Sequence, residues 1–135
     1  GEEETVTALL ELIDAMPDEY VDTRMMERKL SFISQLRDFQ DPRIHARLLA
    51  WLMDEEEEIR FHAVDAIATY PGPETAEVLV QRLLVPDETL RIRNFVMDLL
   101  IQNRWPVPRP HRKALRENLP EEFWIDDTGV IQRKR

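Results

Sequence analysis

An acidic residue stands six positions before an arginine three times along the chain. The three pairs are Asp22 and Arg28, Asp54 and Arg60, and Asp87 and Arg93. Their arginines lie 32 and 33 residues apart. A nearly fixed period of this length, with helical patterning inside each unit, is typical of stacked helix pairs. The spacing therefore predicts an all-α solenoid, an architecture that usually serves as a binding surface.

Apolar residues at helical spacing predict six helices that pair into three hairpins, over about residues 3–38, 41–70 and 74–103. Asp41-Pro42 is the sharpest start signal, because aspartate caps a first turn and proline suits the first helical position. A partial fourth unit is expected over about residues 109–118. Residues 1–118 are therefore predicted to form one helical repeat domain.

The C-terminal tail, residues 119–135, follows a different pattern. Three prolines in residues 105–110 exclude helix there and indicate an extended connector. An apolar run at Phe123–Ile125, turn residues, and a second apolar run at Val130-Ile131 then predict a β-hairpin. Because an isolated hairpin is only marginally stable in water, we expect it to cap the last helices. The alternative is that it engages another molecule, with Arg133–Arg135 as a basic tip.

Composition restricts the chemistry. The chain has no cysteine, which excludes disulfides, thiolate metal sites and cysteine nucleophiles. The net charge is −9, with −12 over residues 1–103 and +3 over residues 104–135. An acidic body repels phosphate backbones, so nucleic acid is not expected as a partner. No apolar run approaches the roughly 20 residues that cross a bilayer, so a membrane is not expected either and cytoplasmic location is the default. The chain starts at Gly1 without methionine, which suggests a fragment of a longer protein.

Aligning the second helix of each hairpin on its arginine separates packed from open positions. Phe32, Val64 and Met97 coincide and are all apolar, as expected of a packed face. Other positions change character between units and are expected to be open. The predicted partner-binding residues at those positions are Lys29, Phe61, Asp65, Asn94 and Asp98.

The acidic turn residue followed by an aliphatic-arginine pair resembles the HEAT repeat. Ile59-Arg60 after Asp54 and Ile92-Arg93 after Asp87 match that pattern, whereas Glu27-Arg28 departs from it at the aliphatic position. Residues 59–84 look most similar to the bacterial HEAT-like repeats related to phycobilisome lyases. The resemblance covers about residues 3–118 and implies a right-handed α-α superhelix.

The resemblance also implies a structural role for the repeated acids and arginines. In that family the acid and the arginine stack into a ladder between neighbouring repeats, since a guanidinium can bond both a carboxylate and helix-end carbonyls. The alternative is an anion groove lined by Arg28, Arg60 and Arg93. We favour the ladder because each arginine has its own acid at a fixed offset.

Enzymatic alternatives fit poorly. His62 and Asp65 could share a helix face, but metal-dependent hydroxylases of this fold use His-Glu pairs, and no His-Glu dipeptide occurs. The HEAT-like DNA glycosylases need a basic groove with aromatic residues; Trp51, Phe61 and Trp105 supply only the aromatics. The acidic run at residues 54–58 lacks the alternating ligands and glycine of a calcium loop. No cofactor, metal or small-molecule substrate is therefore expected, and the chain is not expected to be an enzyme.

The remaining function is a scaffold or adaptor that binds another protein. Phe61 is the expected anchor, because it is aromatic at an otherwise polar position. The acidic surroundings suit a basic or amphipathic partner segment. Trp51 and Trp124 are expected to support a second site, with Trp51 on the convex side that the first helices of the hairpins form.

Overall fold

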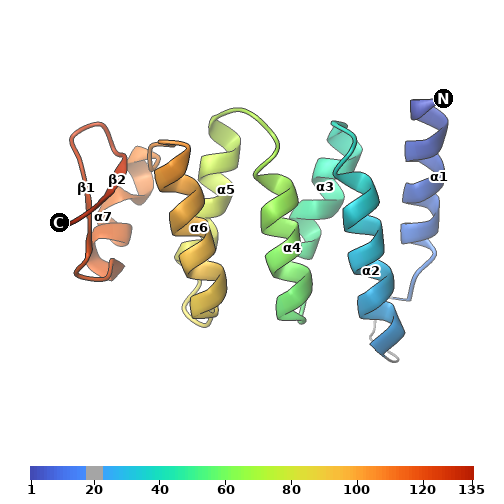
Figure 1. Ribbon diagram of the computed structural model, residues 1–135, viewed down its shortest axis with the longest axis horizontal. Coiled ribbons are helices and arrows are strands. Elements are labelled where there is room, and N and C mark those ends of the chain that lie inside the picture. The colour runs from blue at the N-terminus through green and yellow to red at the C-terminus, as the bar shows by residue number, and fades with distance from the viewer. Residues whose placement is uncertain (18–22) are drawn as a thin grey trace. The chain divides into compact units, whose positions relative to one another are not determined.

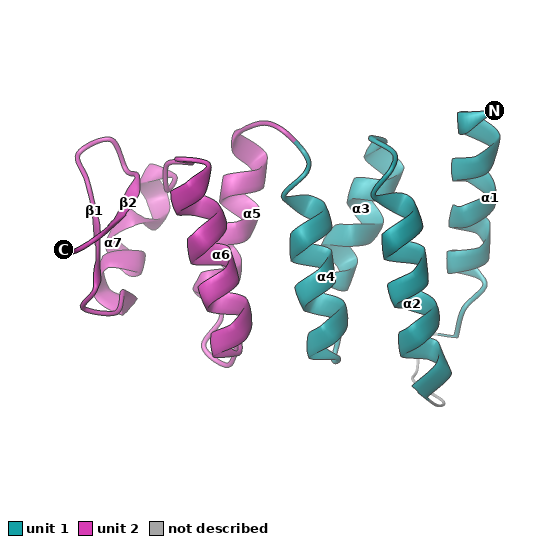
Figure 2. Ribbon diagram, viewed as in Figure 1, with its two compact units in different colours: residues 1–70 teal, residues 71–135 magenta. Residues whose placement is uncertain are grey.

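Seven α-helices and one two-stranded sheet make up the part of the chain that the computed structural model describes, residues 1–17 and 23–135 (Figure 1). The chain divides into two units, residues 1–70 (unit 1) and residues 71–135 (unit 2), shown in separate colours in Figure 2. The mostly helical composition confirms the helical part of the sequence prediction. Asp22, the first of the repeated acids, falls outside the described residues.

Unit 1 consists of two packed helix pairs. Its helices are α1 (Glu2–Asp14), α2 (Thr23–Leu36), α3 (Pro42–Trp51) and α4 (Glu57–Ile67). Helix α1 packs on α2, α3 packs on α4, and α2 also packs on α4. The most deeply buried apolar side chains of this core are Val6, Ile33, Leu36, Ile44, Leu48, Ile59, Ala63, Val64, Ala66 and Ile67.

The start of α3 illustrates how local sequence fixes an element. The Asp41 carboxylate accepts a hydrogen bond from the backbone N–H of Arg43 at 2.8 Å, and Pro42 occupies the first helical position. Aspartate satisfies an otherwise unpaired N–H of the first turn, and proline loses nothing there because it has no N–H to pair. The predicted helix start is confirmed.

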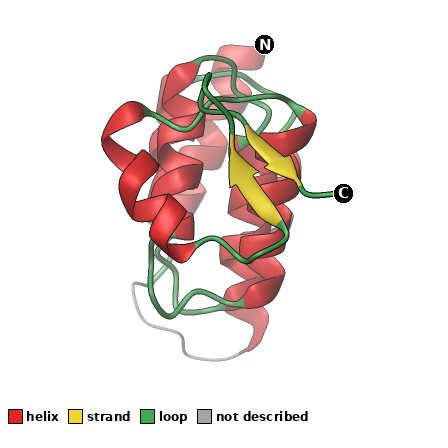
Figure 3. Ribbon diagram, turned by 90° about the vertical axis from the view of Figure 1, so that its left-hand side faces the viewer, coloured by secondary structure: helices red, strands yellow, loops and turns green. Residues whose placement is uncertain are grey.

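Unit 2 combines three helices with a hairpin. Its elements are α5 (Pro73–Leu83), α6 (Leu90–Gln102), α7 (Arg109–Asn118), β1 (Phe123–Ile125) and β2 (Ile131–Arg133). Helix α5 packs on α6 and on α7. Strand β2 lies against α6 and β1 against α7, so the hairpin covers these helices (Figure 3). Helix α6 begins at Leu90, because the Thr89 hydroxyl accepts from the backbone N–H of Ile92 and caps the helix.

The tail hairpin pairs in antiparallel register, with Ile125 opposite Ile131. Alternation along β1 buries Phe123 and Ile125 and leaves Trp124 exposed. The backbone N–H of Val107 donates to the carbonyl of Gly129 at 2.8 Å, which ties the proline-rich connector to the turn. The expected β-hairpin is present and forms part of the core of unit 2.

Glycine is required at the hairpin turn. Gly129 has φ of +91°, and a β-carbon there would collide with the Arg112 guanidinium. That guanidinium donates to the carbonyls of Val107 and Thr128, at 2.9 and 3.2 Å. The turn, the connector and α7 are therefore joined by one arginine that any side chain at position 129 would displace.

Candidate functional site

Two of the three repeated arginines hold the loop that precedes their own helix. The Arg60 guanidinium donates to the carbonyls of Asp54 and Glu55, at 2.9 and 3.1 Å. In unit 2, Arg93 donates to the carbonyls of Val85, Pro86 and Glu88, at 2.6 to 3.1 Å. These backbone contacts assign both arginines a structural role at equivalent places in their hairpins. Arg28 is exposed.

The acid of the second pair joins the two hairpins of unit 1. The Lys29 ammonium on α2 lies 2.6 Å from the Asp54 carboxylate, which precedes α4. Both side chains are buried, 9% and 7% exposed. The second carboxylate oxygen of Asp54 accepts from the backbone N–H of Glu56 at 3.0 Å. Asp54 therefore binds a cation from the preceding hairpin while it supports the start of α4.

This contact corrects one sequence expectation. Lys29 was predicted to be an open, partner-binding position, but it is buried. The alignment places it at a position occupied by Phe61 and Asn94 in the other units, and that mixture suggested exposure. Lysine tolerates burial here because a carboxylate 25 residues away along the chain neutralises it.

The third acid also differs from its expected role. Asp87 is exposed, and the neighbouring Glu88 is the buried carboxylate. Glu88 lies 2.7 Å from Arg82 on α5 and accepts from the backbone N–H of Thr89 at 2.9 Å. The acid that the spacing selected therefore lies in the same loop as the buried carboxylate, one residue before it.

The open face of α4 carries Phe61 and Asp65. Phe61 is half-buried and makes an edge contact with the imidazole of His62, with ring centres 5.5 Å apart. Asp65 is paired with Arg37 after α2 at 2.6 Å, and both side chains remain about one-third to one-half exposed. The two predicted residues of unit 1 therefore lie one helical turn apart on a partly exposed surface.

The corresponding face of α6 carries Asn94 and Asp98. Asn94 is exposed, whereas Asp98 forms an ion pair with Arg133 of strand β2. The same guanidinium lies over the ring of Phe123, 5.6 Å from its centre. Arg133 therefore ties the hairpin to α6, which gives Asp98 a structural contact in addition to its predicted position on the open face.

The histidines lie in separate surroundings. His45 packs against the ring of Tyr70, and His62 lies 3.5 Å from Glu58 one turn earlier on α4. His111 bonds Glu77 at 2.6 Å and thereby links α7 to α5, and this contact holds the pKa of Glu77 below its ordinary value. Across residues 1–17 and 23–135, no three histidine, aspartate or glutamate side chains gather so as to hold a metal ion.

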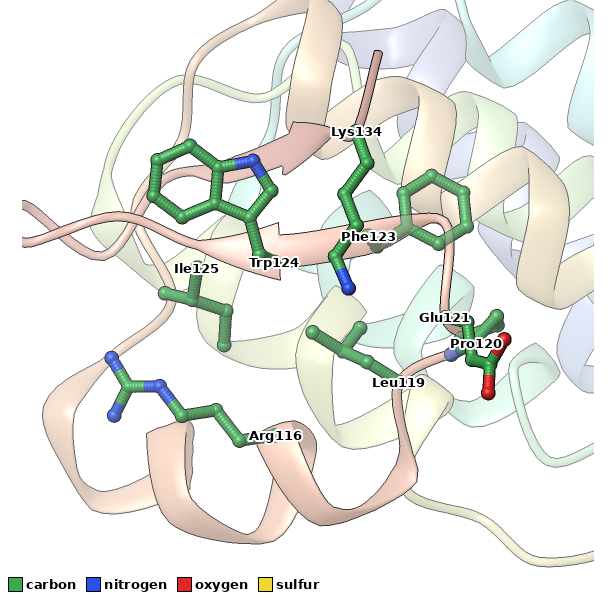
Figure 4. A pocket seen from close by; sticks show the side chains of 8 residues that line it. All are labelled: Arg116, Leu119, Pro120, Glu121, Phe123, Trp124, Ile125 and Lys134. Carbon is green, nitrogen blue, oxygen red and sulfur yellow. The ribbon is translucent and has the colours of Figure 1, made fainter.

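The tryptophans named in the sequence differ in accessibility. Trp51 was expected to support a second site on the convex, first-helix side, but it is buried in unit 1, because α3 turns this position toward the core. Trp124 is 47% exposed. It lies at the mouth of a cavity of about 300 Å³ between α7 and β1, which we call the Trp124 cleft (Figure 4). The residues that line it are Arg116, Leu119, Pro120, Glu121, Phe123, Trp124, Ile125 and Lys134.

Sequence reasoning singled out Trp124 and the basic tip but missed Arg116 and Leu119. Arg116 lies on α7 and Leu119 directly follows that helix, and they meet Trp124 only because β1 folds back along α7. The available signal was an aromatic residue between two apolar ones in a predicted strand. Period-two alternation would have placed its ring on the face opposite the core.

Asp126 holds the hairpin turn. Its carboxylate accepts from the hydroxyl and N–H of Thr128, the side-chain amide of Gln132 and the N–H of Val130, at 2.6 to 3.0 Å. These bonds, led by the Thr128 hydroxyl, lower the pKa of Asp126 from 3.8 to about 2. A depressed carboxylate pKa contributes stability that is complete above the ordinary value and disappears as pH falls through the lowered one.

The turn should therefore loosen only between pH 3.8 and about 2. We expect the NMR shift of the Val130 amide proton to titrate with a midpoint near pH 2. Asp126→Asn should abolish that titration, because it removes the ionisable group. A wild-type midpoint at or above 3.8 would show that the carboxylate is not held in this way.

The geometry defines a class: a mostly helical protein with packed helix pairs, helix arginines that hold the preceding loops, and a small terminal sheet. Within the described ranges, no helix has both the length and the apolar character needed to cross a membrane. Comparison with protein-family models, with curated proteins and with solved structures finds no match.

Proposed function

We propose that this chain is a non-catalytic protein–protein interaction module, a scaffold or adaptor built on HEAT-like hairpins arranged as a right-handed α-α superhelix. Three observations support the repeat interpretation. Helices α1 and α2, α3 and α4, and α5 and α6 pack as pairs. Arg60 and Arg93 hold equivalent loops, and Lys29 with Asp54 links successive hairpins as a ladder contact would. Phe32, Val64 and Met97, equivalent in the alignment, are all buried.

The partner proposed for unit 1 is a basic or amphipathic segment. The observation that carries this proposal is a partly exposed aromatic ring, Phe61, on the most acidic part of the chain. Residues 1–70 contain 17 acidic and 7 basic side chains, a net charge of −10, whereas residues 71–135 carry +1. Opposite charge raises the rate of encounter, and an aromatic ring supplies contact energy at the centre of an interface.

The local contacts of Phe61 suit this role. Asp65 lies one turn further along α4 and shares its carboxylate with Arg37, while the ring of His62, which lies 3.5 Å from Glu58, makes an edge contact with the Phe61 ring. A basic side chain from a partner would compete with Arg37 for Asp65 while an apolar neighbour covers the ring. The same arrangement explains why a purely apolar segment would bind less well.

A labelled basic amphipathic peptide, with lysines around a leucine and phenylalanine core, tests this site by fluorescence anisotropy. We expect Phe61→Ala to weaken binding about tenfold or more, because hot-spot truncations of aromatic anchors have that size. Phe61→Leu should retain part of the affinity. The matched control is Met53→Ala, since Met53 is an exposed apolar side chain of unit 1 outside the α4 face.

Circular dichroism melts of each variant show whether a loss of binding reflects a lost contact or a lost fold. Near-unchanged melting with lost binding supports the proposal. Retained binding in a folded Phe61→Ala, or equal losses in Phe61→Ala and Met53→Ala, contradicts it. If Phe61→Ala unfolds, the folded Phe61→Leu variant carries the test, and unchanged affinity there would also contradict the proposal.

A further inference from the structure

The Trp124 cleft exposes an aromatic ring that the fold of unit 2 does not need for its own core. Strand β1 buries Phe123 and Ile125 on one face, so the intervening Trp124 points to the other (Figure 4). Leu119 and Pro120, at the end of α7, add apolar surface to the same cavity. An indole at the mouth of a cleft offers a large contact area with few rotamers to restrict, which is typical of binding sites.

Two cationic side chains also line the cleft. Arg116 projects from α7, and Lys134 is the residue directly after β2 (Figure 4). Neither guanidinium nor ammonium forms a hydrogen bond or ion pair with any residue that the structure describes. Glu121 is the one carboxylate among the lining residues. The lining thus combines apolar side chains with two cations and one carboxylate, whereas acidic residues surround Phe61 on α4.

The walls of the cleft are held in place by contacts outside it. His111 joins α7 to α5, Arg133 joins β2 to Asp98 of α6, and Asp126 fixes the turn between the strands. A rigid site loses less conformational entropy when it binds than a mobile one. These supports therefore favour a cleft that is formed before its ligand arrives.

We propose that the Trp124 cleft binds an acidic segment of a partner protein, with an apolar side chain inserted beside Trp124 and carboxylates paired with Arg116 and Lys134. The volume, about 300 Å³, lies at the lower end for ligand sites and suits one or two peptide side chains. Charge complementarity selects an acidic over a basic occupant. The proposal is independent of the α4 site, because it concerns different residues and the opposite charge.

The test uses a fluorescein-labelled peptide in which glutamates flank a Phe-Leu pair, titrated into the full chain. Trp124→Ala and Arg116→Glu should each weaken binding about tenfold or more, and binding should weaken as salt is raised. Lys113→Glu is the matched control: Lys113 is an exposed cation on α7 outside the cleft, and the charge change is the same. It should keep the affinity within about threefold of the unmodified chain.

Each other outcome overturns the proposal. Absence of peptide binding, or affinity unchanged by Trp124→Ala, would remove the cleft as the site. Equal losses in Arg116→Glu and Lys113→Glu would indicate general charge attraction. Self-association in analytical ultracentrifugation that Trp124→Ala abolishes would make a second copy the occupant. Displacement of the peptide by duplex DNA or by vesicles of anionic lipid would indicate a different anionic ligand.

Discussion

Replacing Lys29 with methionine is expected to lower the free energy of unfolding of unit 1 by about 3–5 kcal/mol. The substitution preserves most of the side-chain volume but leaves the Asp54 carboxylate without the ammonium that lies 2.6 Å away. Asp54 is 7% exposed, so water cannot replace the lost partner fully. Urea unfolding followed by far-ultraviolet circular dichroism measures the change.

Two further variants separate the loss of the Lys29–Asp54 ion pair from the effect of removing any cation from α2. Arg28→Met changes an exposed neighbour on the same helix, and it should alter stability by less than about 0.5 kcal/mol. Lys29→Met combined with Asp54→Leu should recover part of the loss, because an apolar pair leaves no buried charge unpaired. A loss below about 1 kcal/mol in Lys29→Met alone would show that the pair does not join the hairpins of unit 1.

The second large effect is expected at Ile131, on strand β2. Ile131 is fully buried, and Ile131→Ala should destabilise unit 2 by about 2–5 kcal/mol through lost apolar contact and the cavity left behind. Amide hydrogen exchange of α6 and α7 should accelerate together with that of the hairpin, since both strands pack on these helices. The exchange measurement therefore tests whether the tail, residues 119–135, is part of the core of unit 2.

Trp124→Ala is the control on the same hairpin. Because its ring is half-exposed and faces away from the core, its removal should cost less than about 1 kcal/mol. Exchange that accelerates only in residues 119–135 of Ile131→Ala would contradict this account. The tail would then be an appendage rather than a layer of unit 2.

Local signals in the sequence predicted most of the elements. Asp41-Pro42 marked a helix start that the structure confirms, and the alternating apolar residues around the turn at 126–129 predicted the hairpin. Phe32, Val64 and Met97 were correctly placed in the packed face. These predictions succeeded because each depends on neighbouring residues and on a simple period.

Positions decided by contacts between distant segments were less predictable. Lys29 appeared open because its aligned position changes character between the units, and only the meeting of α2 with the α3–α4 loop brings Asp54 to it. Asp87 and Glu88 are chemically equivalent neighbours, and the position of Arg82 on α5 selects between them. The Trp124 cleft likewise requires β1 to fold along α7 before Arg116 becomes relevant.

Taken together, the two proposals assign the chain two independent binding surfaces: one for a basic protein segment at Phe61 and one for an acidic segment at Trp124. The most direct test titrates the basic and the acidic peptide, in separate experiments, into Phe61→Ala and Trp124→Ala. We predict that Phe61→Ala loses the basic peptide and keeps the acidic one, and that Trp124→Ala does the reverse. If folded forms of both variants bind both peptides as tightly as the unmodified chain, or if one substitution removes both, the account is contradicted.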